Sequence, residues 1–203
     1  MTRIQVWGAI AGASLCAIAI ACPAMAEAVE SKGADQVSWS STPAAVAIRG
    51  ELPAPPVGTS DLKFHEFFKL PVGPLGLEPT EKLMSLDGKR VRIIGYMVAQ
   101  ANPVDGAFIL TPLPVSIGDD DESLADDLPP SAVFVHLPVS NARSVPYIPG
   151  LIKLSGVLSV GSRGEADGRV SGVRLQLDPE IAAAIAVTKE QLAQIKKLPP
   201  QNR

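Results

Sequence analysis

Residues 90–98 read RVRIIGYMV, a polar–apolar alternation that passes into an unbroken apolar run. Alternation with a period of two is typical of a β-strand with one buried face, and the apolar continuation indicates burial on both faces. Gly95 stands inside this run. A glycine within a strand indicates a bulge or a tight bend, as in small barrels. The stretch therefore predicts a central strand of a small, strongly curved sheet.

Four later stretches have the same character and are bounded by Gly, Pro, Asn or Asp. They are residues 107–113, 132–139, 151–160 and 170–177. In the second of these, Val133 and Val135 alternate with Phe134 and His136, so His136 is expected on the side opposite the valines. Short, glycine-punctuated strands favour a mainly β fold, a small five-stranded OB-like (Greek-key) barrel, over the alternative of a five-stranded sandwich.

Short N-terminal helices and a C-terminal amphipathic helix are expected around these strands. Residues 61–88 contain two short helices that pack on the barrel, one capped by Ser60 and one with Pro79 in its first turn. The barrel itself covers residues 89–178. Residues 179–203 form a helix that runs from Pro179 to about Lys197, with a tail after it.

The first 26 residues have the layout of a secretory signal peptide. Arg3 precedes a long apolar run, and Ala24-Met25-Ala26 forms a small-x-small cleavage site before Glu27. Cleavage is expected after Ala26, which predicts a periplasmic or secreted protein. The alternative is a lipid anchor on Cys22, but Pro23 directly after the cysteine is awkward for lipoprotein processing. Residues 27–60, rich in Ala, Pro and Ser, are expected to form a flexible leader.

Composition excludes several classes of chemistry. Cys16 and Cys22 both lie in the signal, so the processed chain has no thiol for a disulfide, a thiolate zinc site or covalently attached haem. The formal net charge is −3, and no basic block is present. We therefore expect no nucleic-acid partner and no stable membrane insertion after signal cleavage.

Residues 86–98, LDGKRVRIIGYMV, resemble the opening motif of a family of exported bacterial proteins of unknown function with an OB-like barrel. The following Phe108-Ile109-Leu110-Thr111-Pro112 is similar to the second strand of that family, and the resemblance extends over residues 86–177. The family usually continues with a Cys-x-His pair, which this chain lacks. Its members often occur near transport systems for metals or envelope components, so the resemblance implies an accessory role.

Candidate metal ligands are the two histidines, His65 and His136, and three residues of an acidic loop, Asp119, Asp121 and Glu122. Carboxylates and imidazoles bind divalent cations when they converge in space. Each has a simpler interpretation as well. The acidic run is typical of a solvated loop, His65 of helix packing among phenylalanines, and His136 of a residue at the barrel rim.

Partner binding is the other candidate function, with Trp39, Phe67 and Phe68 as the aromatic residues that would dock. No nucleophile motif with a matching His and acid is present, so we expect no enzymatic activity and no cofactor. The sequence predicts a non-enzymatic accessory or binding protein that acts through protein contacts in the envelope. A metal-binding protein using His136, His65 and the acidic loop is the alternative, and a hydrolase ranks below both.

Overall fold

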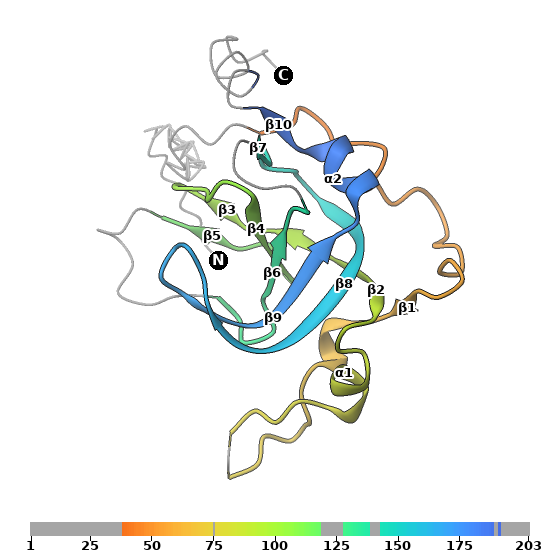
Figure 1. Cartoon of the computed structure of the whole chain (residues 1–203), viewed down its shortest axis with the longest axis vertical. Helices are drawn as coiled ribbons and strands as arrows, with labels where there is room; N and C mark the ends of the chain where they lie inside the picture. Colours follow the sequence, from red (N-terminus) through yellow and green to blue (C-terminus); the bar gives the residue numbers. More distant parts are fainter. Residues whose placement is uncertain (1–37, 75, 119–127, 139–142, 189–190, 192–203) are drawn as a thin grey trace, which may run out of the picture. The chain divides into compact units, whose positions relative to one another are not determined.

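The structure is a computed structural model that describes residues 38–74, 76–118, 128–138, 143–188 and 191 (Figure 1). All of them belong to the compact unit of residues 32–203. The expected signal peptide, the leader residues 27–37 and the acidic loop residues 119–127 lie outside the described residues. Among the described residues, no helix is both long enough and apolar enough to cross a membrane.

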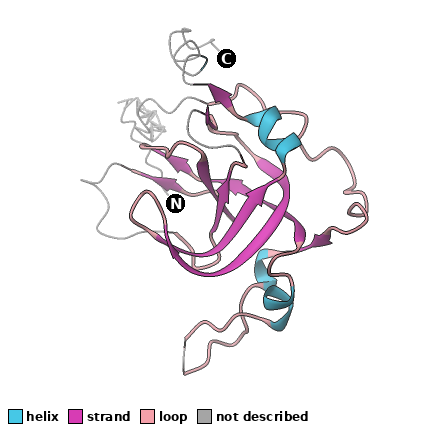
Figure 2. Ribbon diagram, viewed as in Figure 1, coloured by secondary structure: helices cyan, strands magenta, loops and turns pink. Residues whose placement is uncertain are grey.

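Ten strands, two α-helices and one 3-10 helix make up the described part of the chain. In chain order they are β1 Ser60–Asp61, η1 Phe64–Glu66, α1 Glu81–Ser85, β2 Arg90–Met97, β3 Ala99–Gln100, β4 Ala107–Thr111, β5 Ser116–Ile117, β6 Val133–His136, β7 Arg143–Ser144, β8 Leu151–Gly164, β9 Val170–Leu177, α2 Pro179–Ile185 and β10 Val187–Thr188. Strands dominate over helices, as Figure 2 shows. The expected mainly β fold is confirmed.

Five of these strands hydrogen-bond in a ring, in the order β2-β4-β6-β9-β8 and back to β2. The β6–β9 pair is parallel, and the other four pairs are antiparallel. These five strands fall on the five stretches that the sequence predicts. The small five-stranded β domain is therefore confirmed, and it has ring-like pairing.

Two glycines permit the ring to curve tightly. A Cβ atom on Gly156 of β8 would lie 2.2 Å from the carbonyl oxygen of Gln176 on β9. A Cβ atom on Gly95 of β2 would lie 2.7 Å from the carbonyl oxygen of Thr111 on β4. Real Cβ atoms do not approach backbone oxygens so closely, so both positions require glycine. Gly95, which the sequence predicts at a bulge or tight bend, is thus a position where the backbone of β4 approaches closely.

The main core fills the inside of the ring with aliphatic side chains from all five strands. Ile93 of β2 and Leu154 of β8 are partners in the strand register, and both are fully buried. Val133 and Val135 of β6 belong to this core, whereas Phe134 belongs to a second cluster with Val98, Ile109 and Ala132. The predicted alternation of β6 is thus confirmed, and His136 lies on the same side as Phe134.

The N-terminal helices are shorter than expected. Ser60 does not cap a helix, because Ser60–Asp61 forms β1 and pairs in parallel with β2. Only η1 follows. In the second helix, Thr80 caps α1 by accepting a hydrogen bond from the Leu83 amide at 3.1 Å. Pro79 therefore precedes the cap instead of occupying the first turn.

The C-terminal helix breaks within the predicted run to about Lys197, of which residues 189–190 and 192–203 lie outside the described residues. α2 ends at Ile185, and Ala186 is already extended, with ψ of 141°. The β-branched pair Val187–Thr188 then forms β10 against β7. The chain therefore leaves the helix and forms a strand pair at this point. The helical periodicity of Ile181 and Ile185 does not reveal that pairing.

The leader is attached to the domain from Ser38 onward. The Trp39 amide donates to the Tyr147 carbonyl at 2.8 Å, and Val46, which is fully buried, accepts from the Lys153 amide at 2.9 Å. Arg92 donates to the Pro53 carbonyl at 2.8 Å and to both carboxylate oxygens of Asp61, at 2.6 and 2.8 Å. Residues 38–60 are therefore part of the folded unit and not a free leader.

Candidate functional site: a polar cavity beside the ring

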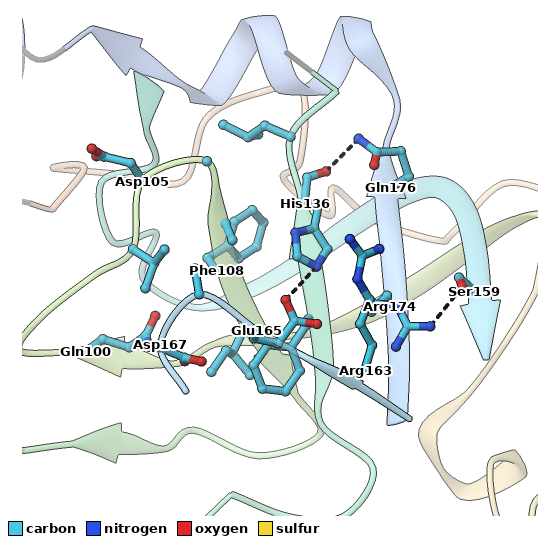
Figure 3. A pocket seen from close by; sticks show the side chains of 17 residues that line it. Gln100, Asp105, Phe108, His136, Ser159, Arg163, Glu165, Asp167, Arg174 and Gln176 are labelled. Carbon is cyan, nitrogen blue, oxygen red and sulfur yellow. Dashed lines mark hydrogen bonds and ion pairs between the residues drawn. The ribbon is translucent and has the colours of Figure 1, made fainter. Parts of the chain in front are cut away.

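A cavity of about 350 Å³ lies against β4, β6 and β9 and is walled by two loops. One loop contributes Val104 to Gly106 before β4, and the other contributes Glu165 to Asp167 between β8 and β9. Phe108, Ile109 and Phe134 give the cavity an apolar wall. Charged and polar side chains line other parts of it (Figure 3). Apolar walls with a few oriented polar groups are typical of small-molecule sites.

The strand register brings His136 to this cavity. His136 is the last residue of β6, where it pairs with Ala107 of β4 and with Gln176 of β9. The Gln176 side-chain amide donates to the His136 carbonyl at 3.3 Å. The imidazole therefore projects from a backbone that is held on both sides, and its side chain is 30% exposed.

Glu165 reaches from the β8–β9 loop toward His136, as Figure 3 shows. Its Oε2 lies 3.2 Å from His136 Nε2, and its side chain is only 8% exposed. Its Oε1 accepts a short hydrogen bond from the Ser171 hydroxyl. Although the two atoms are close, the buried Nε2 of His136 has no hydrogen-bond partner among the described residues.

Arg174 of β9 extends this cluster below the loop. The residue is 8% exposed, and its Nη1 donates to the Gly161 carbonyl at 2.6 Å and to the Ser171 hydroxyl at 3.0 Å. Its Nη2 donates to the Ser159 hydroxyl at 3.0 Å. Arg174 thereby satisfies its charge inside the protein and ties β9 to β8 near the register shift between Val160 and Arg163.

The other charged residues of the cavity wall differ in how far the protein already engages them. Asp167 is paired with Arg169, whose Nη1 lies 3.0 Å from its Oδ2. Asp105 accepts from the Ser144 hydroxyl at 2.5 Å. Arg163, at the end of β8, is exposed. The wall therefore contains three carboxylates that accept hydrogen bonds from the protein.

Of the metal ligands proposed from the sequence, only His136 lies at the cavity. His65 is an exposed residue of η1. Asp119, Asp121 and Glu122 lie outside the described residues. Within the described ranges, no group of three or more His, Cys, Asp or Glu side chains is placed to hold a metal ion.

The three aromatic residues proposed for partner binding pack on the main core. Phe67 is fully buried, and its ring stacks on Phe64 with centroids 5.3 Å apart. Phe68 meets Phe67 edge-on at 6.5 Å. Trp39 and Phe68 are partly buried against the core. Phe67 is therefore unavailable to a partner in this structure, because the core already occupies its ring.

Sequence reasoning missed Glu165, Ser171 and Arg174. The glycine-rich stretch 161–168 predicts only a loose hairpin loop, and a serine and an arginine on a strand are usually solvent-facing. The available signal was the pattern of β9, where Ser171 interrupts the apolar alternation of Val173, Leu175 and Leu177, whereas Arg174 occupies a polar position of that alternation. Burial of Arg174 then requires acceptors, which the loop carbonyl and the two hydroxyl groups provide.

Comparisons with known proteins identify no family for this chain. No protein-family model matches it, and no curated protein matches it. Among solved structures, the chain is similar to a DUF3299 family protein from Pseudomonas aeruginosa PAO1, with a TM-score of 0.37 and 14% sequence identity. That similarity covers 59% of this chain and 93% of the other chain.

Proposed function

We propose that this chain is an exported, non-enzymatic accessory protein of the cell envelope, and that it acts by binding a small ligand in the cavity beside β4, β6 and β9. The observation that supports the proposal most is the position of the cavity. It lies on the outer face of two consecutive antiparallel strands, between the β3–β4 and β8–β9 loops. Five-stranded OB-type folds bind their ligands on the corresponding face, between the corresponding loops.

The volume and the construction of the wall fit binding as well. About 350 Å³ accommodates a small organic molecule. The Arg174 and Glu165 side chains are held by hydrogen bonds within the protein, so little side-chain entropy remains to be lost when a ligand enters.

The envelope location and the absence of catalysis are parts of the proposal that have their own experimental tests. The signal layout of residues 1–26 supports export. The His136 imidazole lies beside the Glu165 carboxylate, and no serine, threonine or cysteine is hydrogen-bonded to His136 among the described residues. A ligand recovered chemically unchanged after incubation supports binding without turnover.

A protein-observed NMR screen with defined fragment mixtures tests the site. We expect amide shifts to cluster at Gly106, Ala107 and Gly168. The variant Ala166→Trp, which places an indole at an exposed position of the cavity wall, should abolish them. Ala184→Trp, at an exposed position of α2 outside the wall, is the matched control. Shifts that survive Ala166→Trp, or that cluster elsewhere, contradict the proposal.

Metal binding by His136 is the second candidate, because His136 Nε2 and Glu165 Oε2 lie 3.2 Å apart, a separation that two ligands of one ion can have. Zn²⁺ titration in the same NMR experiment tests it. Loss of shifts in His136→Ala supports the metal site. Zinc-induced shifts that persist in His136→Ala overturn it.

A further inference from the structure

We infer that the cavity selects an anion, a small organic acid or phosphate-type group, and that Arg163 is the residue that selects it. The inference rests on the proposed function, because it assigns the chemical class of the ligand for the same cavity. The charged groups of the wall differ in how many of their hydrogen-bond donors and acceptors the protein already uses.

The carboxylates of the wall already accept hydrogen bonds from the protein. Glu165 accepts from Ser171 and faces His136, and Asp167 accepts from the side chain and the backbone amide of Arg169. Both side chains are largely buried, at 8% and 14% exposure. Little surface of these two carboxylates is therefore left for a cationic ligand, whereas Asp105, the third carboxylate of the wall, is exposed and accepts from the Ser144 hydroxyl.

The two arginines of the wall differ in whether the protein already uses their hydrogen-bond donors. Arg174 is buried, and both of its Nη atoms donate to acceptors of the protein. Arg163 is exposed, and the contacts found for it among the described residues involve its backbone carbonyl, which accepts from Ser171 at 3.4 Å. Its guanidinium is thus the cation of the wall that keeps donors for a ligand.

His136 adds a second donor on the same wall. Its Nε2 is buried and has no hydrogen-bond partner among the described residues, although it lies 3.2 Å from Glu165. A ligand oxygen near this nitrogen would give it a partner. A guanidinium offers two parallel N–H groups that match a carboxylate or a phosphate, so a ligand with acceptor oxygens uses what the wall has available.

Isothermal titration with four probes tests the inference: succinate, inorganic phosphate, neutral succinamide and cationic 1,4-diaminobutane. We expect succinate or phosphate to bind, and succinamide and the diamine to bind at least about tenfold more weakly, because hydrogen bonds to charged groups are the stronger ones. The binding of succinate against that of phosphate distinguishes the two anion types.

Arg163→Gln should weaken binding of the anion by about tenfold or more, the scale of a lost charge-assisted hydrogen bond. Arg49→Gln removes the same charge from an exposed residue outside the wall and should leave the affinity unchanged. An unchanged affinity in Arg163→Gln overturns the inference. Equal weakening in Arg49→Gln also overturns it, because it indicates an effect of net charge alone.

The failure of this inference is distinguishable from failure of the proposed function. Binding of succinamide or the diamine that Ala166→Trp abolishes leaves the cavity as a ligand site and refutes its preference for anions. A fragment screen that gives no amide shifts at the cavity, together with a probe set that shows no binding by titration, refutes the two proposals together.

Discussion

Glu165 Oε2 lies 3.2 Å from His136 Nε2 and joins the β8–β9 loop to the strand β6 across the cavity. The two residues are far apart in the chain and come together because β9, which follows the loop, runs parallel to β6. Ser171 and Arg174 extend the contact to β9 and β8. Glu165 therefore links this loop to both β6 and β9.

Glu165→Gln should loosen this loop, because it removes the negative charge of the carboxylate that faces His136 and accepts a hydrogen bond from Ser171. We expect a loss of about 1 to 2 kcal/mol in the free energy of unfolding, on the scale of a hydrogen bond to a charged group. Faster amide exchange should appear at Gly168, whose amide donates to the Glu165 carbonyl at 3.1 Å. Hydrogen exchange followed by NMR measures both effects.

The control for this variant is Glu180→Gln, at an exposed position of α2. It removes the same charge and should change the free energy of unfolding by less than about 0.5 kcal/mol. Equal exchange rates at Gly168 in the wild type and in Glu165→Gln would show that the carboxylate does not hold the loop.

Gly156→Ala should destabilise the ring, because the added Cβ would lie 2.2 Å from the Gln176 carbonyl oxygen. The backbones of β8 and β9 must then separate, at a cost of about 1 to 3 kcal/mol, the usual scale for overpacking. Gly164→Ala, in the same strand, meets nothing within 4 Å and is the control. Urea denaturation of both variants measures the difference, and equal midpoints would contradict the close approach.

Asp61→Asn should reduce stability at neutral pH and make little difference in acid. The hydrogen bonds from Arg92 hold the pKa of Asp61 below its usual value of 3.8, against an opposing effect of burial. A depressed folded-state pKa contributes stability above the unfolded-state pKa, and that contribution is lost as the pH falls through the folded-state value. We expect a loss of about 1 kcal/mol near pH 7, reduced because Asp61 is 40% exposed.

Thermal unfolding at pH 7 and at pH 2.5 measures this linkage. The difference in free energy between wild type and Asp61→Asn should shrink at the lower pH. Asp87→Asn, whose carboxylate accepts from the Val160 amide at 2.9 Å without an arginine partner, is the comparison. A difference for Asp61→Asn that stays constant with pH would rule out the linkage to Arg92.

Processing of the signal should leave Glu27 as the first residue of the exported protein. Mass spectrometry of protein recovered from the periplasm of an expressing bacterium measures the terminus directly. Ala26→Arg should block cleavage there, because the small residue before the cut is replaced by a large charged one. A lipid-modified Cys22 at the N-terminus would instead establish the anchored form.

Local alternation predicted the ring strands well, because each of them has one face in an aliphatic core. Val133, Val135 and His136 were assigned to the correct faces of β6 from a period of two alone. The same reasoning failed after Ile185, because a helical stripe carries no sign that Val187 and Thr188 will pair with β7. A local sequence pattern therefore predicts which face of a strand is buried, whereas the strand with which it pairs depends on the tertiary structure.

The candidate site was predictable only at His136. Its partner Glu165 lies in a loop whose composition indicates a turn, and its position follows from the parallel pairing of β6 with β9. That pairing joins strands separated by β7 and β8 in the chain, and no periodicity within either strand contains it. Arg174 shows the same limit, since its burial depends on a carbonyl and hydroxyl groups supplied by other segments.

The placement of β9 between β6 and β8 also imposes an order on assembly. Before residues 170–177 have been synthesised, β6 and β8 each lack a neighbour, and both present unpaired backbone groups along one edge. A chain that ends before Val170 therefore exposes two unpaired strand edges, which can pair with another chain, and it lacks Arg174 as well. Premature termination, or a delay in delivering the last strand, should favour association between chains over folding within one chain.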